Sequence, residues 1–128
     1  MNFDELSLSD FDIVASDAIP AITLDRQRRF YINVSARRLL GIKPHQRLSV
    51  AYSPDKRLLA VIRPNVDATP AEKAALATSS YNVTDRYYMS ARLFAREYGF
   101  EPDEAPYSFD YVHGRSDGSM AMFKLREQ

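Results

Sequence analysis

Hydrophobic and polar positions alternate early in the chain. Ile22 and Leu24 alternate with small or polar neighbours, which is typical of a half-buried strand. Residues 30–34 are rich in aromatic and β-branched side chains and predict a second strand. The polar residues 25–28 between them predict a turn, so the chain is expected to reverse direction here.

A short helix is predicted directly after the second strand, over about residues 34–40. Three apolar residues fall on one face at helical spacing: Ala36, Leu39 and Leu40. Ser35 can cap the helix start through its hydroxyl. Gly41 favours the left-handed conformation that ends helices, and Pro44 follows three residues later. Apolar residues then alternate from Leu48, and a polar turn at 53–56 and a return strand at 57–63 complete a predicted β-hairpin.

Residues 81–126 repeat this order of elements. Extended aromatic segments precede a predicted helix with an apolar stripe. Ser90 can cap this helix, and Gly99 ends it. A hairpin with its turn at 114–118 follows. The stripe consists of Ala91, Phe94, Ala95 and Tyr98. The repeat indicates two similar units. The alternative is one α+β sheet domain whose halves look alike by chance.

We therefore predict an α+β fold with two strand–helix–β-hairpin units joined by a short helical linker. Thr69 can cap the linker helix at 71–78, and Pro70 fits its first position. The predicted divisions are an acidic N-terminal arm at 1–20, a basic unit at 21–64, a linker at 65–80 and a second, diverged unit at 81–128.

The zero net charge of the 128-residue chain conceals a strong partition. Residues 1–20 carry five acids and no base, residues 21–65 carry ten bases and two acids, and residues 66–128 carry seven bases and ten acids. Such a partition concerns partners more than fold. The basic segment either faces an anionic partner or is a solvated face that pairs with the chain's own acids. The arm either docks its apolar side on the core or lies over the basic segment.

Little in the sequence supports catalysis or binding of a metal or cofactor. There is no cysteine, and the two histidines, His45 and His113, have no neighbouring ligands at metal spacing. Only four glycines are present, and none form a phosphate-binding loop. No apolar run approaches the roughly 20 residues that span a bilayer, and the N-terminus is not a secretory signal. We expect a cytoplasmic protein that is not an enzyme.

Residues 24–42 read LDRQRRFYINVSARRLLGI: a strand end, an acidic then basic turn, a strand and a short R-R-L-L-G-I helix. This order resembles the AbrB/SpoVT/MazE-type swapped-hairpin DNA-binding domains. The resemblance covers about residues 21–64, and also 81–126 if these are a diverged copy. It implies that two units interleave, either within one chain as a pseudo-dimer or between two chains as a homodimer.

The resemblance also implies that basic residues around the first turn and the helix start face DNA. Carried across by position, these are Arg29, Arg37 and Arg38. With their basic neighbours, the predicted nucleic-acid-binding residues are Arg26, Arg28, Arg29, Arg37, Arg38 and Lys43. Two residues depart from the family pattern: Arg28 replaces the turn glycine, and Asn33 replaces the proline that leads into the helix.

The leading hypothesis is a small DNA-binding regulator, of a phage, plasmid or toxin–antitoxin type, that contacts the phosphate backbone and grooves of double-stranded DNA. Guanidinium groups bind phosphate in a bidentate manner, and such contacts make affinity salt-dependent. The alternative is a protein–protein interaction module or inhibitor on the same scaffold, which the acidic segments favour. Tyr87, Tyr88 and Tyr98 are either a stacking surface or part of the core.

Overall fold

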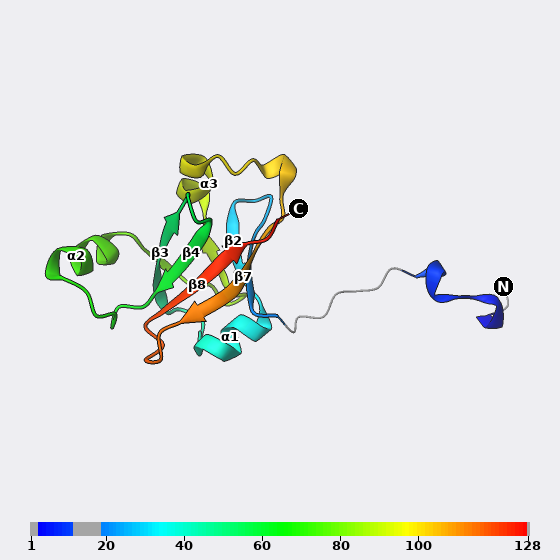
Figure 1. Ribbon diagram of the computed structural model, residues 1–128, viewed down its shortest axis with the longest axis horizontal. Helices are drawn as coiled ribbons and strands as arrows, with labels where there is room; N and C mark the ends of the chain where they lie inside the picture. Colours follow the sequence, from blue (N-terminus) through cyan, green and yellow to red (C-terminus); the bar gives the residue numbers. More distant parts are fainter. Residues whose placement is uncertain (1–2, 12–18, 128) are drawn as a thin grey trace.

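The computed structural model describes residues 3–11 and 19–127. Eight antiparallel strands form one sheet in the order β5-β3-β4-β8-β7-β1-β2-β6 (Figure 1). The outermost strands, β5 and β6, approach each other, so the sheet nearly closes into a barrel. The strands are β1 Ala21–Leu24, β2 Arg29–Ile32, β3 Arg47–Ser53, β4 Leu58–Ile62, β5 Ser80–Asn82, β6 Tyr88–Ser90, β7 Tyr107–Gly114 and β8 Met120–Leu125. The α-helices are α1 Val34–Leu40, α2 Pro70–Thr78 and α3 Arg92–Tyr98, and short 3-10 helices span Phe3–Glu5, Leu8–Asp10 and Pro102–Glu104.

The prediction of two strand–helix–hairpin units is wrong. Hydrogen bonds join the two halves at four strand pairs: β1 with β7, β4 with β8, β3 with β5, and β2 with β6. Within the first half, β1–β2 and β3–β4 are separated in the sheet by β7 and β8. Isolated hairpins are marginally stable in water, whereas a nearly closed sheet shares one core and removes most free edges. One α+β sheet, the alternative interpretation of the sequence, describes the observed topology.

If β5 and β6 are counted as adjacent, the eight strands form a ring in which each strand of the first half has a counterpart in the second: β1 and β5, β2 and β6, β3 and β7, β4 and β8. Exchanging every strand with its counterpart leaves the same pairs of strands as neighbours. Two strand pairs, β2–β6 and β4–β8, consist of counterparts from the two halves, and they lie on opposite sides of the ring. Loop hydrogen bonds repeat in the same way, because Ile32 N donates to Tyr87 O and Ala91 N donates to Arg28 O. The β2–β6 pair therefore marks one side of the barrel, and the β4–β8 pair marks the opposite side.

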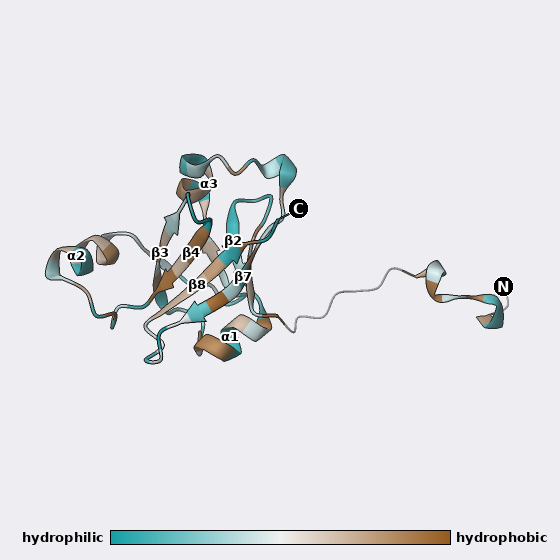
Figure 2. Cartoon of the chain, in the orientation of Figure 1, coloured by the Kyte–Doolittle hydropathy of each residue, from teal (hydrophilic) through white to brown (hydrophobic). Residues whose placement is uncertain are grey.

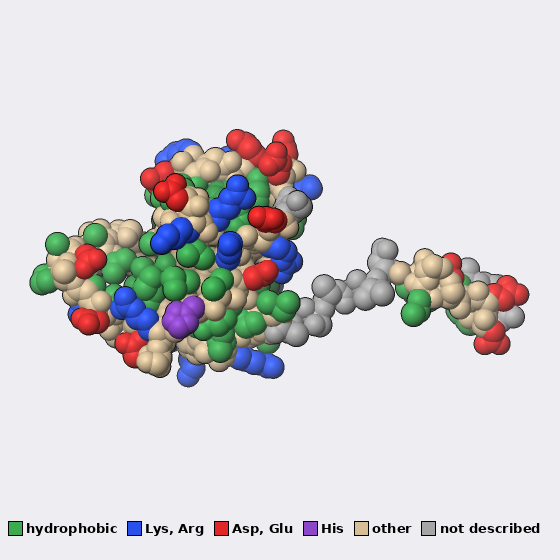
Figure 3. Space-filling view, in the orientation of Figure 1, with side chains coloured by type: hydrophobic (Ala, Val, Ile, Leu, Met, Phe, Trp, Pro, Cys, Tyr) green, Lys and Arg blue, Asp and Glu red, His purple; other side chains and the backbone are tan. Residues whose placement is uncertain are grey.

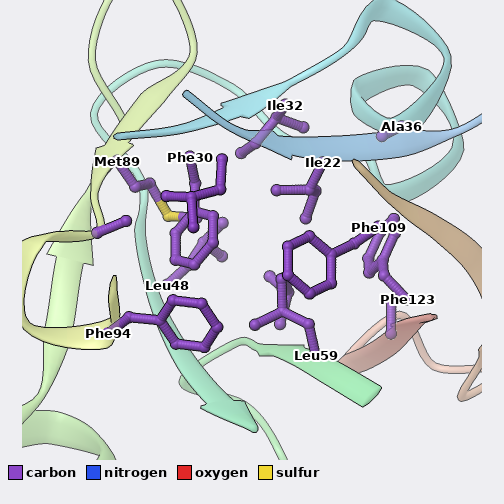
Figure 4. Close-up of a cluster of buried hydrophobic side chains, with 14 of the residues drawn as sticks. Ile22, Phe30, Ile32, Ala36, Leu48, Leu59, Met89, Phe94, Phe109 and Phe123 are labelled. Atoms are coloured by element: carbon purple, nitrogen blue, oxygen red, sulfur yellow. The ribbon is translucent and has the colours of Figure 1, made fainter. Parts of the chain in front are cut away.

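The core inside the barrel draws on both halves (Figure 4). The largest fully buried side chains include Phe30, Phe109, Phe123, Ile22, Leu24, Ile32, Leu48, Leu59 and Met89. The aromatic rings among them meet edge to face, as Phe30 and Phe109 do with ring centroids 6.4 Å apart. Because alternate residues of a strand point to opposite faces, these positions leave the intervening residues of β2 and β6 on the outer surface.

The three predicted helices are present, but two of their caps differ from expectation. Helix α1 spans Val34–Leu40, and its cap is Asn33, whose Oδ1 accepts from Ala36 N at 2.9 Å, instead of Ser35. Asn33 Oδ1 also accepts from Ala21 N, so the residue ties the helix to β1. Helix α3 begins after Ala91 without a side-chain cap, although Ser90 was expected to provide one. Helix α2 has the predicted Thr69 cap, completed by Glu72.

The linker region covers part of the outside of the sheet. The sequence of β4, LLAVI, is a continuous apolar run (Figure 2), and its last four residues are buried. Continuous apolar strands are buried on both faces. Val66 of the linker packs on the outer residues Ala60 and Ile62, with partly buried Leu76 of α2 against them. No residue of α2 is itself fully buried, so the helix covers the sheet mainly through Leu76.

The N-terminal residues 3–11 lie apart from the sheet (Figure 1). Phe3 and Leu8 are each 79% exposed, and Phe11 is 58% exposed. The expectation that the apolar side of the arm docks on the core, and the alternative that it lies over the basic segment, are therefore wrong for these residues. The rest of the arm, residues 12–18, falls outside the described residues.

Candidate nucleic-acid interface

The first turn, residues 25–28, is built by Asp25. Its Oδ1 accepts from Gln27 N at 2.9 Å and from Arg29 N at 3.0 Å, which fixes the chain reversal between β1 and β2. Arg28 has a φ of 58°, the left-handed region that favours glycine. The backbone at this position therefore favours glycine, and an arginine meets the requirement here. The Nε of Arg28 is buried and has no hydrogen-bond partner among the described residues.

Arg29, the first residue of β2, points outward and makes two contacts. Its guanidinium pairs with Asp25 through bonds of 2.9 Å from Nε and from Nη2 to Oδ2. The same group lies over the ring of Tyr88 on β6, with its central carbon 4.0 Å from the ring centroid. Its side chain remains 42% exposed. Arg29 therefore presents an oriented cation at the surface, part of whose charge Asp25 offsets.

Arg37 on α1 is held at the other end of the same strand pair. Its Nε donates to Ile32 O at 2.7 Å, and its Nη2 donates to Tyr31 Oη at 2.6 Å. Its guanidinium carbon lies 3.8 Å from the ring centroid of Tyr87. These contacts fix the planar group in one orientation, as stacking and forked donation do for arginine.

The two arginines are connected by the tyrosines between them. The rings of Tyr31 and Tyr88, opposite each other on β2 and β6, have centroids 5.2 Å apart. We call Arg29, Tyr31, Arg37, Tyr87 and Tyr88 the arginine–tyrosine ladder. It runs along the outer face of the β2–β6 pair and contains residues of both halves.

The second turn, residues 84–87, mirrors the first. Thr84 Oγ1 accepts from Tyr88 N at 3.1 Å, and Tyr87 has a φ of 65°. Asp85 pairs with His45, Nε2 to Oδ1 at 2.7 Å, and both side chains are largely exposed. Because the halves interleave, this turn lies beside α1, whereas the first turn lies beside the start of α3.

The six predicted residues thus fall into two groups. Arg26, Arg38 and Lys43 are exposed, whereas Arg28, Arg29 and Arg37 are half-buried. The sequence also singled out Tyr87 and Tyr88, and both belong to the ladder, but Tyr98 packs against Tyr52 and Phe94 at a different place. Tyr31 was missed because a residue in an aromatic strand gives no sign of which face it occupies. Arg86 and Arg92, exposed residues of the second half, flank the same strand pair.

Within the described residues, no group of three or more His, Cys, Asp and Glu could hold a metal ion. The described part of the chain also contains no helix that is long and apolar enough to cross a membrane. Comparison of the chain with protein-family models, with curated proteins and with solved structures finds no match.

Proposed function

We propose that the protein binds double-stranded DNA through the outer face of β2–β6 and the two turns that flank it. The observation that carries the proposal is the arginine–tyrosine ladder, with exposed cations at its ends. The resemblance of residues 24–42 to AbrB-type DNA-binding domains points to two of the same residues, Arg29 and Arg37. On this proposal the protein is a small cytoplasmic regulator and not an enzyme.

The ladder suits a phosphate-binding surface because its cations are oriented before binding. A guanidinium stacked on tyrosine loses less side-chain freedom when it binds. The donors of Arg29 and Arg37 that Asp25, Ile32 and Tyr31 do not use are then held ready for phosphate oxygens. Arg26, Arg38 and Lys43 supply long-range attraction and direct phosphate contacts, whereas Arg29 and Arg37 position the surface. Phosphate contacts of this kind give affinity and register without specifying a base sequence.

Fluorescence anisotropy with a random-sequence duplex, titrated from low to physiological salt, tests the proposal. Each lost phosphate contact should reduce the salt slope by about 0.9. We expect the Arg26→Ala/Arg38→Ala/Lys43→Ala variant to bind more weakly and with a shallower slope than the wild type.

A matched control removes three exposed cations from the opposite side of the barrel: Lys56→Ala/Arg57→Ala/Lys124→Ala. Arg57 and Lys124 are close neighbours, since Leu125 N donates to Arg57 O and Leu58 pairs with Lys124. The control has the same net charge as the test variant and should retain most of the affinity. Equal losses in both variants would show a non-specific charge effect and contradict the proposed interface.

The protein–protein module remains the second candidate function, and one observation favours it. The arm exposes Phe3, Leu8 and Phe11, and exposed large apolar side chains close together often mark contact sites. Absence of DNA binding even at low salt would overturn the first candidate and favour this one. Capture of a defined partner that is lost when Phe3, Leu8 and Phe11 are replaced by serine would then support the second candidate.

A further inference from the structure

A groove with basic sides lies between α2 and strand β3 of the barrel. Two adjoining cavities, of about 490 Å³ and about 330 Å³, share Arg47 and Pro64 in their walls. We call this the basic groove, and the residues used below are Arg47, Arg63, Pro64, Val66, Lys73 and Leu76. The floor of the larger cavity is apolar, whereas the smaller cavity is lined mostly by polar side chains, and three cations but no carboxylate line the groove as a whole.

The cations of the groove are placed by the fold. Arg47 donates from Nε and Nη2 to the hydroxyl and carbonyl oxygens of Ser80, and Arg63 donates from Nη2 to Leu40 O. Ser49 Oγ donates to Leu76 O at 2.8 Å and links α2 to β3. The groove is thus formed by the fold, with its positive rim and apolar floor both in place.

The cavity on the other side of Leu76 differs in charge. Its volume is about 390 Å³, and its lining includes Asp67 and Glu72 as well as Arg115. Hydrophobic side chains also gather there between α2 and the sheet (Figure 3). An acidic occupant is therefore directed to the basic groove and away from this second cavity.

One segment of the chain has the complementary character. Residues 3–11 contain three acids, Asp4, Glu5 and Asp10. Phe3 and Phe11 flank these acids and Leu8 lies among them, and all three apolar side chains are exposed. Apolar anchors beside carboxylates match an apolar floor beside cations.

We propose that the N-terminal arm of a second copy of this chain docks in the basic groove. The arm enters the barrel at β1, which lies four strands from β3 in either direction around the ring. Figure 1 accordingly places residues 3–11 and α2 on opposite sides of the molecule. Reciprocal docking of two arms in two grooves forms a closed twofold dimer. This proposal is independent of the DNA interface, which lies on β2–β6.

Sedimentation equilibrium of the full-length protein over a range of concentrations tests the exchange. We expect a reversible dimer for the wild type and a monomer for the Phe3→Ser/Phe11→Ser variant. Lys73→Glu should raise the dimer dissociation constant about tenfold, and adding Asp10→Lys should recover part of the loss. Because these residues are exposed, the thermal midpoint of the monomer should not change.

Lys56→Glu makes the same charge change in the β3–β4 turn, outside the groove, and should leave the dimer unaffected. A wild type that remains monomeric at all concentrations would overturn the proposal, whether its arm is free or docks on its own chain. Equal weakening by Lys56→Glu and Lys73→Glu, or a dimer that persists in the Phe3→Ser/Phe11→Ser variant, would overturn it as well.

Discussion

The two turns that flank β2–β6 have the same backbone but different side chains. In both, the first residue accepts a hydrogen bond from the backbone N–H four residues later, and the fourth residue has a φ near 60°. The first turn meets this requirement with Asp25 and Arg28, and the second with Thr84 and Tyr87. The fold therefore demands a turn geometry and leaves the residue types open to function.

The difference in side chains gives the two turns different tasks. The first turn carries cations, Arg26 and Arg28, and its Asp25 orients Arg29. The second turn carries Tyr87, the ring on which Arg37 of the first half stacks. Because each turn lies beside the helix of the other half, a basic half and a more neutral half together form one surface.

The largest effect is expected at the buried residues beneath this surface. Phe30 and Met89 are directly opposite on β2 and β6, and both are about 1% exposed. Phe30→Ala should lower the free energy of unfolding by about 3–5 kcal/mol, and Met89→Ala by about 2–3 kcal/mol. Phe30 should cost more because its ring also packs on Phe94, with centroids 5.0 Å apart. Urea denaturation measures both, and a larger loss at Met89 would contradict this order.

The next largest loss of stability is expected at Asp25 and Thr84, whose side chains hold the two turns. Asp25→Ala removes two backbone hydrogen bonds and an ion pair, so we expect a loss of about 2 kcal/mol. Thr84→Ala removes one backbone hydrogen bond and should cost about 1 kcal/mol. The difference in free energy of unfolding, again from urea denaturation, should shrink in 1 M salt as screening weakens the ion pair. A difference that salt does not change would remove the ion pair from the explanation.

Smaller effects are expected at Arg28 and Tyr87, the positive-φ residues of the two turns, and glycine substitutions there should change the stability in opposite directions. A left-handed conformation costs a non-glycine residue about 1–2 kcal/mol, and glycine itself costs about 0.5–1 kcal/mol of chain entropy. Arg28→Gly should therefore stabilise the protein by about 0.5 kcal/mol. Tyr87→Gly gains the same relief but loses the stacking of Arg37, so it should destabilise by about 1 kcal/mol. The thermal midpoints should move in opposite directions, and a decrease for both variants would show that Arg28 is not strained.

The smallest effect is a loss of stability at high pH that depends on Tyr52 of β3 and Tyr107 of β7. Burial raises the pKa of Tyr52 despite the opposing charge of Arg57, and burial together with Glu104 raises the pKa of Tyr107. The unfolded chain then loses these protons at lower pH than the folded protein, so stability falls as pH rises above about 10. The thermal midpoint of Tyr52→Phe and Tyr107→Phe should fall less between pH 9 and pH 11 than that of the wild type. An unchanged pH profile in both variants would contradict the pKa directions.

Much of the local structure could be predicted because it depends on near neighbours in sequence. The sequence correctly predicted the helix at 34–40 and its end at Gly41, and also the Thr69-capped helix that ends at Thr78. Helical spacing, glycine and capping residues all act within a few positions of the chain. The hairpin after Arg47 follows from alternation and a polar turn in the same way.

The pairing of the halves was decided only by the tertiary structure. Aromatic and β-branched runs place Phe30 and Phe109 on strands, but they do not show that the two rings share one core, because non-local pairing depends on the burial available to the whole chain. For the same reason the sequence identified Arg29 and Arg37 as basic residues but did not pair them with Tyr88 and Tyr87, which lie 59 and 50 residues further along the chain. The sequence by itself determined the elements and the charge. Long-range packing decided the single barrel, and it also decided which of those charges are oriented into one surface.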